Sequence, residues 1–125
     1  MVFFNGGEMI KIIRYLKSFY RRGRYGWDYT DVFSMDQYLS TIIPQMLRHL
    51  VTKRVCPAEF YDDDINKAYN KWHEKLVEIA DGFEKYNEYD LKEDVDYNSK
   101  EYEEIRKNRD KSLELLVKYF DNLWW

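Results

Sequence analysis

The chain has 125 residues, of which 34% are charged, and a formal net charge of −3. A chain of this length can form one domain with its own core, and we expect a single helical domain over residues 1–125. No run of about 18 apolar residues occurs, which excludes a membrane-spanning helix and favours a cytoplasmic protein without a membrane partner. Cys56 is the only cysteine, so a disulfide framework and a cysteine metal cluster are excluded.

The two halves of the sequence carry opposite charge. Residues 1–56 hold nine Lys/Arg and four Asp/Glu, a net +5, whereas residues 57–125 hold eleven and nineteen, a net −8. This split could steer a charged partner to one end of the molecule, or it could reflect helices that neutralise one another inside one fold. We favour the second interpretation, and we do not expect direct DNA binding.

The first predicted helix covers residues 8–20. Its apolar residues recur at steps of three and four, as on one face of an amphipathic helix. They are Met9, Ile12, Ile13, Leu16, Phe19 and Tyr20. Residues 6–7 are two glycines that break the chain before this helix, and residues 21–26 are expected to form a loop after it, with Gly23 as the C-terminal cap.

The second predicted helix covers residues 34–52 and is expected to be the one on which the others pack. Asp28 is expected to cap a short helical turn over residues 29–33 before it. The apolar residues of the helix over residues 34–52 are Met35, Tyr38, Leu39, Ile42, Ile43, Met46, Leu47, Leu50 and Val51. Pro44 inside this helix leaves the carbonyl of Ser40 without its usual donor, which predicts a kink but not a break. We interpret the kink as curvature around a core, with a bend that shapes a groove as the alternative.

Two further helices are predicted. Residues 62–64 are aspartates that open a helix whose apolar residues are Ile65, Ala68, Tyr69, Trp72, Leu76, Ile79, Ala80, Phe83 and Tyr86. Residues 87–98 are acidic with weak periodicity and predict a loop. The last helix starts near Ser99, and its apolar residues are Tyr102, Ile105, Leu113, Leu116, Phe120, Leu123 and Trp124. The pattern predicts an all-α fold, a compact bundle or orthogonal array of about four main helices with a Pro-kinked central helix.

Motifs for a reaction centre are missing from the sequence. It contains no P-loop, no GxGxxG, no HExxH and no GxSxG. Cys56 has no activating context and the two histidines are scattered, so we expect no catalytic residue, no metal site and no cofactor. Asp28 and Asp31 could do acid–base chemistry in an enzyme of unfamiliar type, although carboxylates near a helix start more often cap backbone donors.

Residues 21–27 combine three arginines with glycines and aromatic residues. Guanidinium groups match the geometry of phosphate and carboxylate, and aromatic rings beside them can stack on a base. Arg109 falls in phase with the apolar residues of the last helix and could complete an anion site. The predicted ligand-binding residues are therefore Arg21, Arg22, Arg24, Tyr25, Trp27 and Arg109. The alternative, which we favour, is that these arginines pair with the acidic C-terminal half and that the tryptophan belongs to the core.

Residues 25–39, YGWDYTDVFSMDQYL, resemble a widespread family of small uncharacterised bacteriophage proteins with the approximate pattern G-[FWY]-S-x-x-D-x-W-x-x-D-x-Y-L. Later features are similar in the same order: Ile43-Pro44, Leu47-Arg48, Trp72 with Leu76, Gly82-Phe83, Lys118-Tyr119-Phe120 and Leu123-Trp124. The chain departs from the pattern at Phe33, where Trp is usual, and at Asp28, where Ser is usual. The family has no established activity, so the resemblance implies a phage origin and no functional residues.

A small, aromatic-rich domain without a reaction centre is typical of a binding protein. We therefore expect a non-catalytic phage accessory protein, a counter-defence or host-takeover module in the cytoplasm of an infected bacterial host. Its partner would be a host or defence-system protein, or a nucleotide-type small molecule that it sequesters. Aromatic residues make up 18% of the chain, so we also expect a homo-oligomer with contacts through Trp124 and Trp125.

Overall fold

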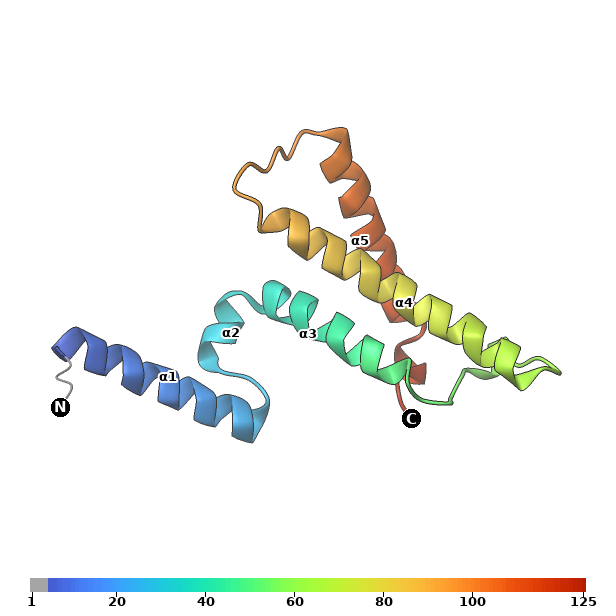
Figure 1. Ribbon diagram of the computed structural model, residues 1–125, viewed down its shortest axis with the longest axis horizontal. Coiled ribbons are helices and arrows are strands. Elements are labelled where there is room, and N and C mark those ends of the chain that lie inside the picture. The colour runs from blue at the N-terminus through green and yellow to red at the C-terminus, as the bar shows by residue number, and fades with distance from the viewer. Residues whose placement is uncertain (1–4) are drawn as a thin grey trace. The chain divides into compact units, whose positions relative to one another are not determined.

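The computed structural model describes residues 5–125, which form helices and connecting segments without a β-strand (Figure 1). The α-helices are α1 (Gly6–Tyr25), α2 (Tyr29–Phe33), α3 (Met35–Leu50), α4 (Ile65–Asp90) and α5 (Lys100–Lys118). Two short 3-10 helices are η1 (Ala58–Phe60) and η2 (Phe120–Asn122). The predicted all-α class is confirmed. None of the helices in the described part of the chain has the length and apolar character needed to span a bilayer.

The chain divides into two compact units. The first ends at Tyr38 and the second covers Leu39–Trp125. The boundary lies inside α3, so its first four residues belong with α1 and α2, whereas most of its length belongs with α4 and α5. The single domain expected over residues 1–125 stays a prediction.

In the first unit, α1 is longer than the sequence pattern predicted. Asn5 caps its start by accepting a hydrogen bond from the Glu8 amide at 2.8 Å, so the glycines that follow are helical. The predicted loop over residues 21–26 is wrong, because the helix continues to Tyr25 and ends at Gly26, whose φ is 82°. Arginine is a good helix former, and a single interior glycine costs only about 1 kcal/mol, so Gly23 does not end the helix.

The predicted turn over residues 29–33 is confirmed as α2. Asp28 is its N-cap, and a capping box forms in which the Asp31 carboxylate accepts the Asp28 amide at 2.7 Å. Tyr38, at the start of α3, donates from its hydroxyl to the Gly26 carbonyl at 2.5 Å. These bonds tie the end of α1, the whole of α2 and the first turn of α3 into one unit.

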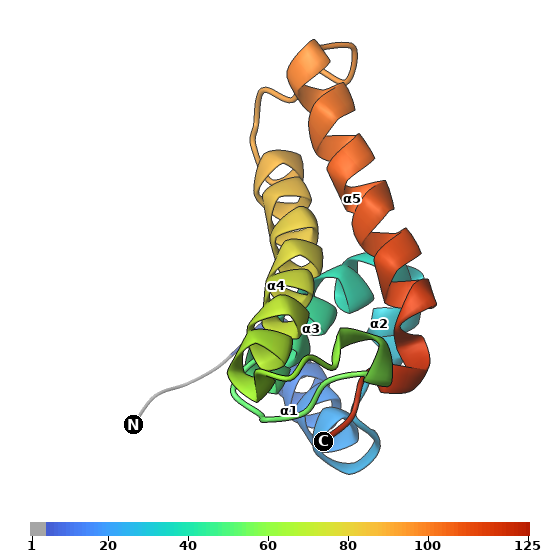
Figure 2. The same ribbon diagram turned by 90° about the vertical axis from the view of Figure 1, so that its right-hand side faces the viewer.

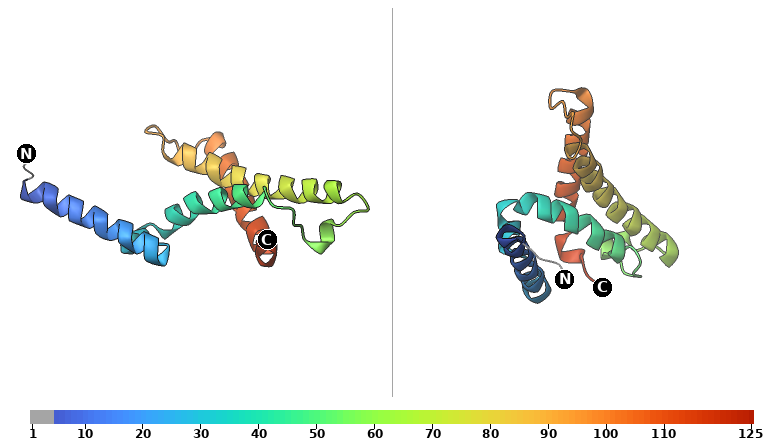
Figure 3. Two further views of the ribbon diagram at one scale, coloured as in Figure 1. Left: turned by 60° about the horizontal axis from the view of Figure 1, so that its bottom comes forward. Right: turned by 60° about the vertical axis from the view of Figure 1, so that its left-hand side comes forward.

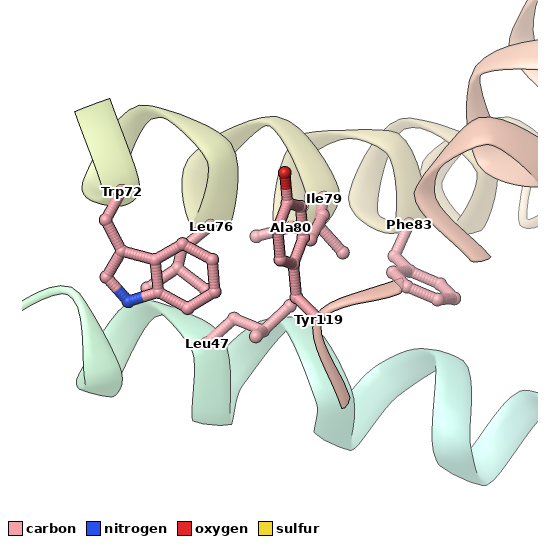
Figure 4. Packing of buried hydrophobic residues seen from close by; sticks show 7 residues of the cluster. All are labelled: Leu47, Trp72, Leu76, Ile79, Ala80, Phe83 and Tyr119. Carbon is pink, nitrogen blue, oxygen red and sulfur yellow. The ribbon is translucent and has the colours of Figure 1, made fainter. Parts of the chain in front are cut away.

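In the second unit, α4 supplies most of the hydrophobic core. Its start follows the prediction, because Asp64 is the N-cap, but the predicted end is wrong, because the helix continues to Asp90, four residues into the predicted loop over residues 87–98. Figure 4 shows the buried cluster of Leu47 from α3, Tyr119 after α5, and Trp72, Leu76, Ile79, Ala80 and Phe83 from α4. The sequence placed α3 at the centre, yet within α3 only Pro44 and Leu47 are buried.

α5 packs along α4 through small residues, and the two helices lie side by side (Figure 2). Ser99 is the N-cap of α5, close to the predicted start, and its Oγ accepts a hydrogen bond from the Tyr102 amide at 3.1 Å. A Cβ atom placed on Gly82 would lie 1.9 Å from the Ser112 Oγ and 2.9 Å from the Asn108 carbonyl oxygen. Glycine is therefore required at this point, where α5 lies too close to α4 to leave room for a Cβ atom.

α3 continues through Pro44 and lies beside α4, as Figure 3 also shows. The Ser40 carbonyl, which proline leaves without its helical donor, accepts a hydrogen bond from the Asn87 side-chain nitrogen at 2.8 Å. The neighbouring helix thus replaces the missing amide donor. This bond satisfies the carbonyl and also links α3 to α4.

This arrangement makes a prediction about Asn87. The Asn87→Ala variant should lose about 1–2 kcal/mol of unfolding free energy, because the half-buried Ser40 carbonyl is left without a donor. In a Pro44→Ala background the new amide at residue 44 can donate to the same carbonyl, so the Asn87→Ala change should cost under about 0.5 kcal/mol. Urea unfolding of the four proteins measures this coupling. An equal cost in both backgrounds would show that the bond does not compensate for the proline.

Candidate functional site

Two of the three arginines predicted to bind an anion pair with carboxylates inside their own unit. Arg21 Nε donates to Asp28 Oδ1, and Arg22 Nη2 donates to Asp31 Oδ1 at 2.8 Å. The alternative prediction, that they pair with the acidic C-terminal half, is therefore wrong for these two residues. An anionic ligand at this position would have to displace both carboxylates.

Asp28 lies at the centre of this cluster and is buried. Its Oδ2 accepts hydrogen bonds from the Thr30 hydroxyl at 2.5 Å and the Ser18 hydroxyl at 2.9 Å. The Thr30 hydroxyl, Arg21 and Ser18 hold the pKa of Asp28 well below its usual range, although burial opposes them. Hydrogen bonds from Arg22 and from the Asp28 amide likewise lower the pKa of Asp31. Carboxylates with such low pKa values are weak bases at neutral pH, which disfavours the alternative acid–base role for this pair.

The aromatic part of the predicted site is exposed. Trp27 keeps 43% of its surface exposed, so it does not belong to the core, and its ring centre lies 6.1 Å from that of Tyr29. Arg24 lies over the ring of Tyr25 at 5.5 Å, and Arg21 lies over Tyr29 at 4.4 Å. The arginines and rings of residues 21–29 thus contact one another.

Arg109 belongs to the second unit and has its partners there. Its guanidinium carbon lies 4.1 Å from the centre of the Tyr86 ring, and its Nε donates to Asp110 at 3.0 Å. The charge that falls in phase with the apolar residues of α5 is therefore balanced by a ring and by its neighbour in sequence. A role for Arg109 in binding an anion stays a prediction.

A second candidate site lies in the second unit, between α3 and the C-terminal segment that begins in the last turn of α5. It has a volume of about 930 Å³, and we call it the apolar groove. It is lined by Ile43, Gln45, Met46, Leu47, His49, Leu50, Lys53, Leu116, Phe120, Leu123, Trp124 and Trp125. Met46, Phe120 and Trp124 are each about two-thirds exposed, with values of 66%, 68% and 65%. Apolar side chains are therefore presented to solvent along the groove.

The polar groups of the apolar groove gather around Trp125. Lys53 Nζ lies 3.5 Å from the centre of the indole ring, and the His49 ring meets it edge-on at 5.9 Å. The Lys53 carbonyl is also held by His73 Nε2 of α4 at 2.9 Å. No carboxylate side chain lines the groove, so one end of an otherwise apolar surface is cationic. Such a surface can bind apolar side chains and an adjacent acid.

Sequence reasoning treated the groove residues as core or as a self-association tail. Leu47 is in the core, but the helical period alone cannot tell it from Met46, which is exposed. Two features of the sequence could have indicated the groove: the wide apolar face of α3 and the aromatic residues at Trp124 and Trp125. That face is wider than one neighbouring helix can cover, and the alternative reading of the Pro44 kink did include a groove.

Cys56 and the metal-ligating residue types are the other reactive groups that the sequence analysis considered. Burial raises the pKa of the Cys56 thiol, which disfavours the nucleophilic thiolate. Across residues 5–125, no group of three or more His, Cys, Asp or Glu side chains is placed to hold a metal ion.

The Asp28 cluster makes a prediction about pH. A pKa lowered by folding stabilises the fold above the unfolded value of about 3.9, and this contribution is lost as the pH falls through the folded pKa. Asn is also a good N-cap, so Asp28→Asn removes the charge and keeps the cap. Thermal unfolding followed by circular dichroism should show the variant less stable at neutral pH, with the difference shrinking below about pH 4.

The matched control for this prediction is Asp36→Asn, which changes an exposed carboxylate of the same unit. The control should remain close to the unchanged protein at every pH. A deficit in Asp28→Asn that is the same at acidic and neutral pH would contradict the proposed ionic stabilisation.

No protein-family model matches this sequence, and neither a curated protein nor a solved structure matches it.

Proposed function

We propose that this protein is a non-catalytic binding module that holds an amphipathic helix of a partner protein in the apolar groove. The observation that carries the proposal is the run of exposed apolar side chains along α3 and the segment after α5. Apolar patches of this kind on a folded protein are typical of interaction sites. Tryptophan and methionine are also among the residues enriched at interfaces.

The form of the groove favours a helical partner segment. One wall is α3, which continues as one helix through Pro44, and the other wall is the segment from Leu116 to Trp125. A helix that lies in such a groove inserts apolar residues at positions i, i+3, i+4 and i+7. A volume of about 930 Å³ leaves room for several such side chains.

The charge of the groove indicates which partner helix would fit. Lys53 and His49 lie at the Trp125 end, and carboxylate side chains do not line the groove. A partner helix with Asp or Glu beside its apolar face would place these carboxylates near the Lys53 ammonium group and the His49 ring. We therefore propose an acidic amphipathic helix as the bound segment.

The arginine cluster also favours a protein partner over a nucleotide. Arg21 and Arg22 are engaged with Asp28 and Asp31, and a nucleotide phosphate would have to compete with both. The apolar groove needs no such displacement. We propose that the partner is a host or defence-system protein of an infected bacterium, a source that depends on the resemblance to the phage family.

The proposal is tested by selecting binders from a library of random helical peptides. Enriched peptides should carry apolar residues at helical spacing together with acidic residues. The double variant Met46→Glu, Phe120→Glu should bind them at least about tenfold more weakly, because it places two charges on the apolar surface. Both residues lie outside the buried core, so the variant should unfold at nearly the same temperature.

The matched control is Val117→Glu, which changes an equally exposed apolar residue that does not line the groove. It should bind the peptides as the unchanged protein does. Peptides that bind the groove variant and the control equally well would show that the apolar groove is not the binding site.

A second copy of the chain is the competing occupant of the groove. Self-association through Trp124 and Trp125 predicts a dimer mass in light scattering at high micromolar concentration, and a monomer mass for Trp124→Glu. A monomer mass for the unchanged protein at that concentration would end the expectation of a homo-oligomer.

A further inference from the structure

The apolar face of α1 is the second large apolar surface of the molecule. No residue of α1 is buried, and its apolar residues keep between 38% and 72% of their surface exposed: Met9, Ile12, Ile13, Leu16, Phe19 and Tyr20. At 3.6 residues per turn these six side chains fall within an arc of about 120°. This continuous stripe is wider than the two-position seam of a coiled coil.

The opposite side of α1 is basic. The helix contains six Lys/Arg and one acidic residue, Glu8. Lys11, Arg14 and Lys17 are exposed, and no ion pair is formed by them within the described part of the chain. Their cationic groups are therefore available to an anionic partner.

The contacts of α1 with its own unit lie on its polar side. Ser18 and Arg21 are the two half-buried residues of the helix, and both donate to Asp28. Arg22 pairs with Asp31 on the same side. By the helical period, these three residues lie roughly opposite Leu16 and Met9. The turn that holds α2 against α1 thus leaves the apolar stripe uncovered.

We propose that α1 is an interfacial helix that lies on an anionic lipid surface, with its apolar stripe among the acyl chains and its lysines and arginines at the headgroups. A helix with a distinct apolar face, a strongly basic polar face and low overall hydrophobicity is typical of this mode of binding. Long basic side chains can place their stems along the apolar boundary and their charges at the phosphates. The proposal does not depend on the apolar groove.

Charge decides between the lipid surface and a second copy of the helix. A pair of α1 helices packed through their stripes would carry twelve basic side chains and only two acidic ones, so neither copy offers the other a compensating negative charge. An anionic lipid surface supplies many negative groups and attracts each nearby Lys or Arg. The expectation of no membrane partner came from the missing transmembrane segment, and a helix that lies in the interface needs no such segment.

The test is co-sedimentation of the whole protein with lipid vesicles at low ionic strength. The protein should bind vesicles of phosphatidylcholine with phosphatidylglycerol and bind vesicles of phosphatidylcholine alone far more weakly. The triple variant Lys11→Gln, Arg14→Gln, Lys17→Gln should bind the anionic vesicles about a hundredfold more weakly, since each basic residue near the surface contributes about fivefold. Added salt should weaken binding of the unchanged protein.

The matched control replaces three exposed basic residues of the second unit, Lys85→Gln, Lys100→Gln and Arg106→Gln, and should keep most of the binding. A second variant, Leu16→Gln with Phe19→Gln, should lose binding at unchanged charge and unfold at an unchanged temperature. Equal loss in both triple variants, equal binding to both vesicle types, or a lowered unfolding temperature in the Leu16 and Phe19 variant would each overturn the proposal. The last result would show that the stripe is packed within the folded chain.

Discussion

The attachment of α3 to α4 is the constraint on which the second unit depends. Pro44 removes one backbone donor from α3, and the Asn87 side chain supplies the replacement to the Ser40 carbonyl at 2.8 Å. About two turns further along α3, Arg48 donates to Asp81 and to Glu84 of α4 at 2.6–2.8 Å. Leu47 lies between these polar links and enters the core beside Leu76. The polar bonds fix the register of α3, and the same register leaves Met46 and Leu50 in the wall of the apolar groove.

The first unit follows a different principle, because Asp28 is its buried side chain and, among residues 5–38, no apolar side chain is buried. Asp28 collects donors from α1 and α2, and burial of its charge is compensated by Arg21 and by hydroxyl groups. All of these donors come from the polar side of α1. Because α1 contacts α2 through its polar side, its apolar side is left uncovered. This explains why no α1 residue is buried although the helix is amphipathic.

The helices could be predicted from the sequence wherever a local signal was sufficient. Asp28, Asp64 and Ser99 are the caps of α2, α4 and α5, and each is recognisable from its own short side chain before an apolar period. The end of α1 was misplaced because Gly23 and Gly26 could each be the C-terminal cap of the helix. Only the structure shows that Gly26 is the one with positive φ. The hydrogen-bond and ion-pair partners of polar side chains could not be predicted from the sequence either. The hydrogen bond from Asn87 to Ser40 joins residues 47 positions apart. The Arg21–Asp28 pair forms because Arg21 lies in α1, whereas the sequence placed Arg21 in a loop.

The distribution of charge shows why counting by halves of the sequence was a poor guide to function. The C-terminal half is acidic overall, yet its apolar groove is lined by Lys53 and His49 and by no carboxylate. Many of the acidic side chains of α4 are occupied elsewhere, since Asp81 and Glu84 hold Arg48, and Glu78 holds Lys75 and Lys111. Each uncovered apolar surface therefore has a cationic margin in a protein whose net charge is −3. A single cationic end suits a few carboxylates on a folded partner, whereas the basic side of α1 extends along several turns and suits the repeated anionic groups of a lipid surface.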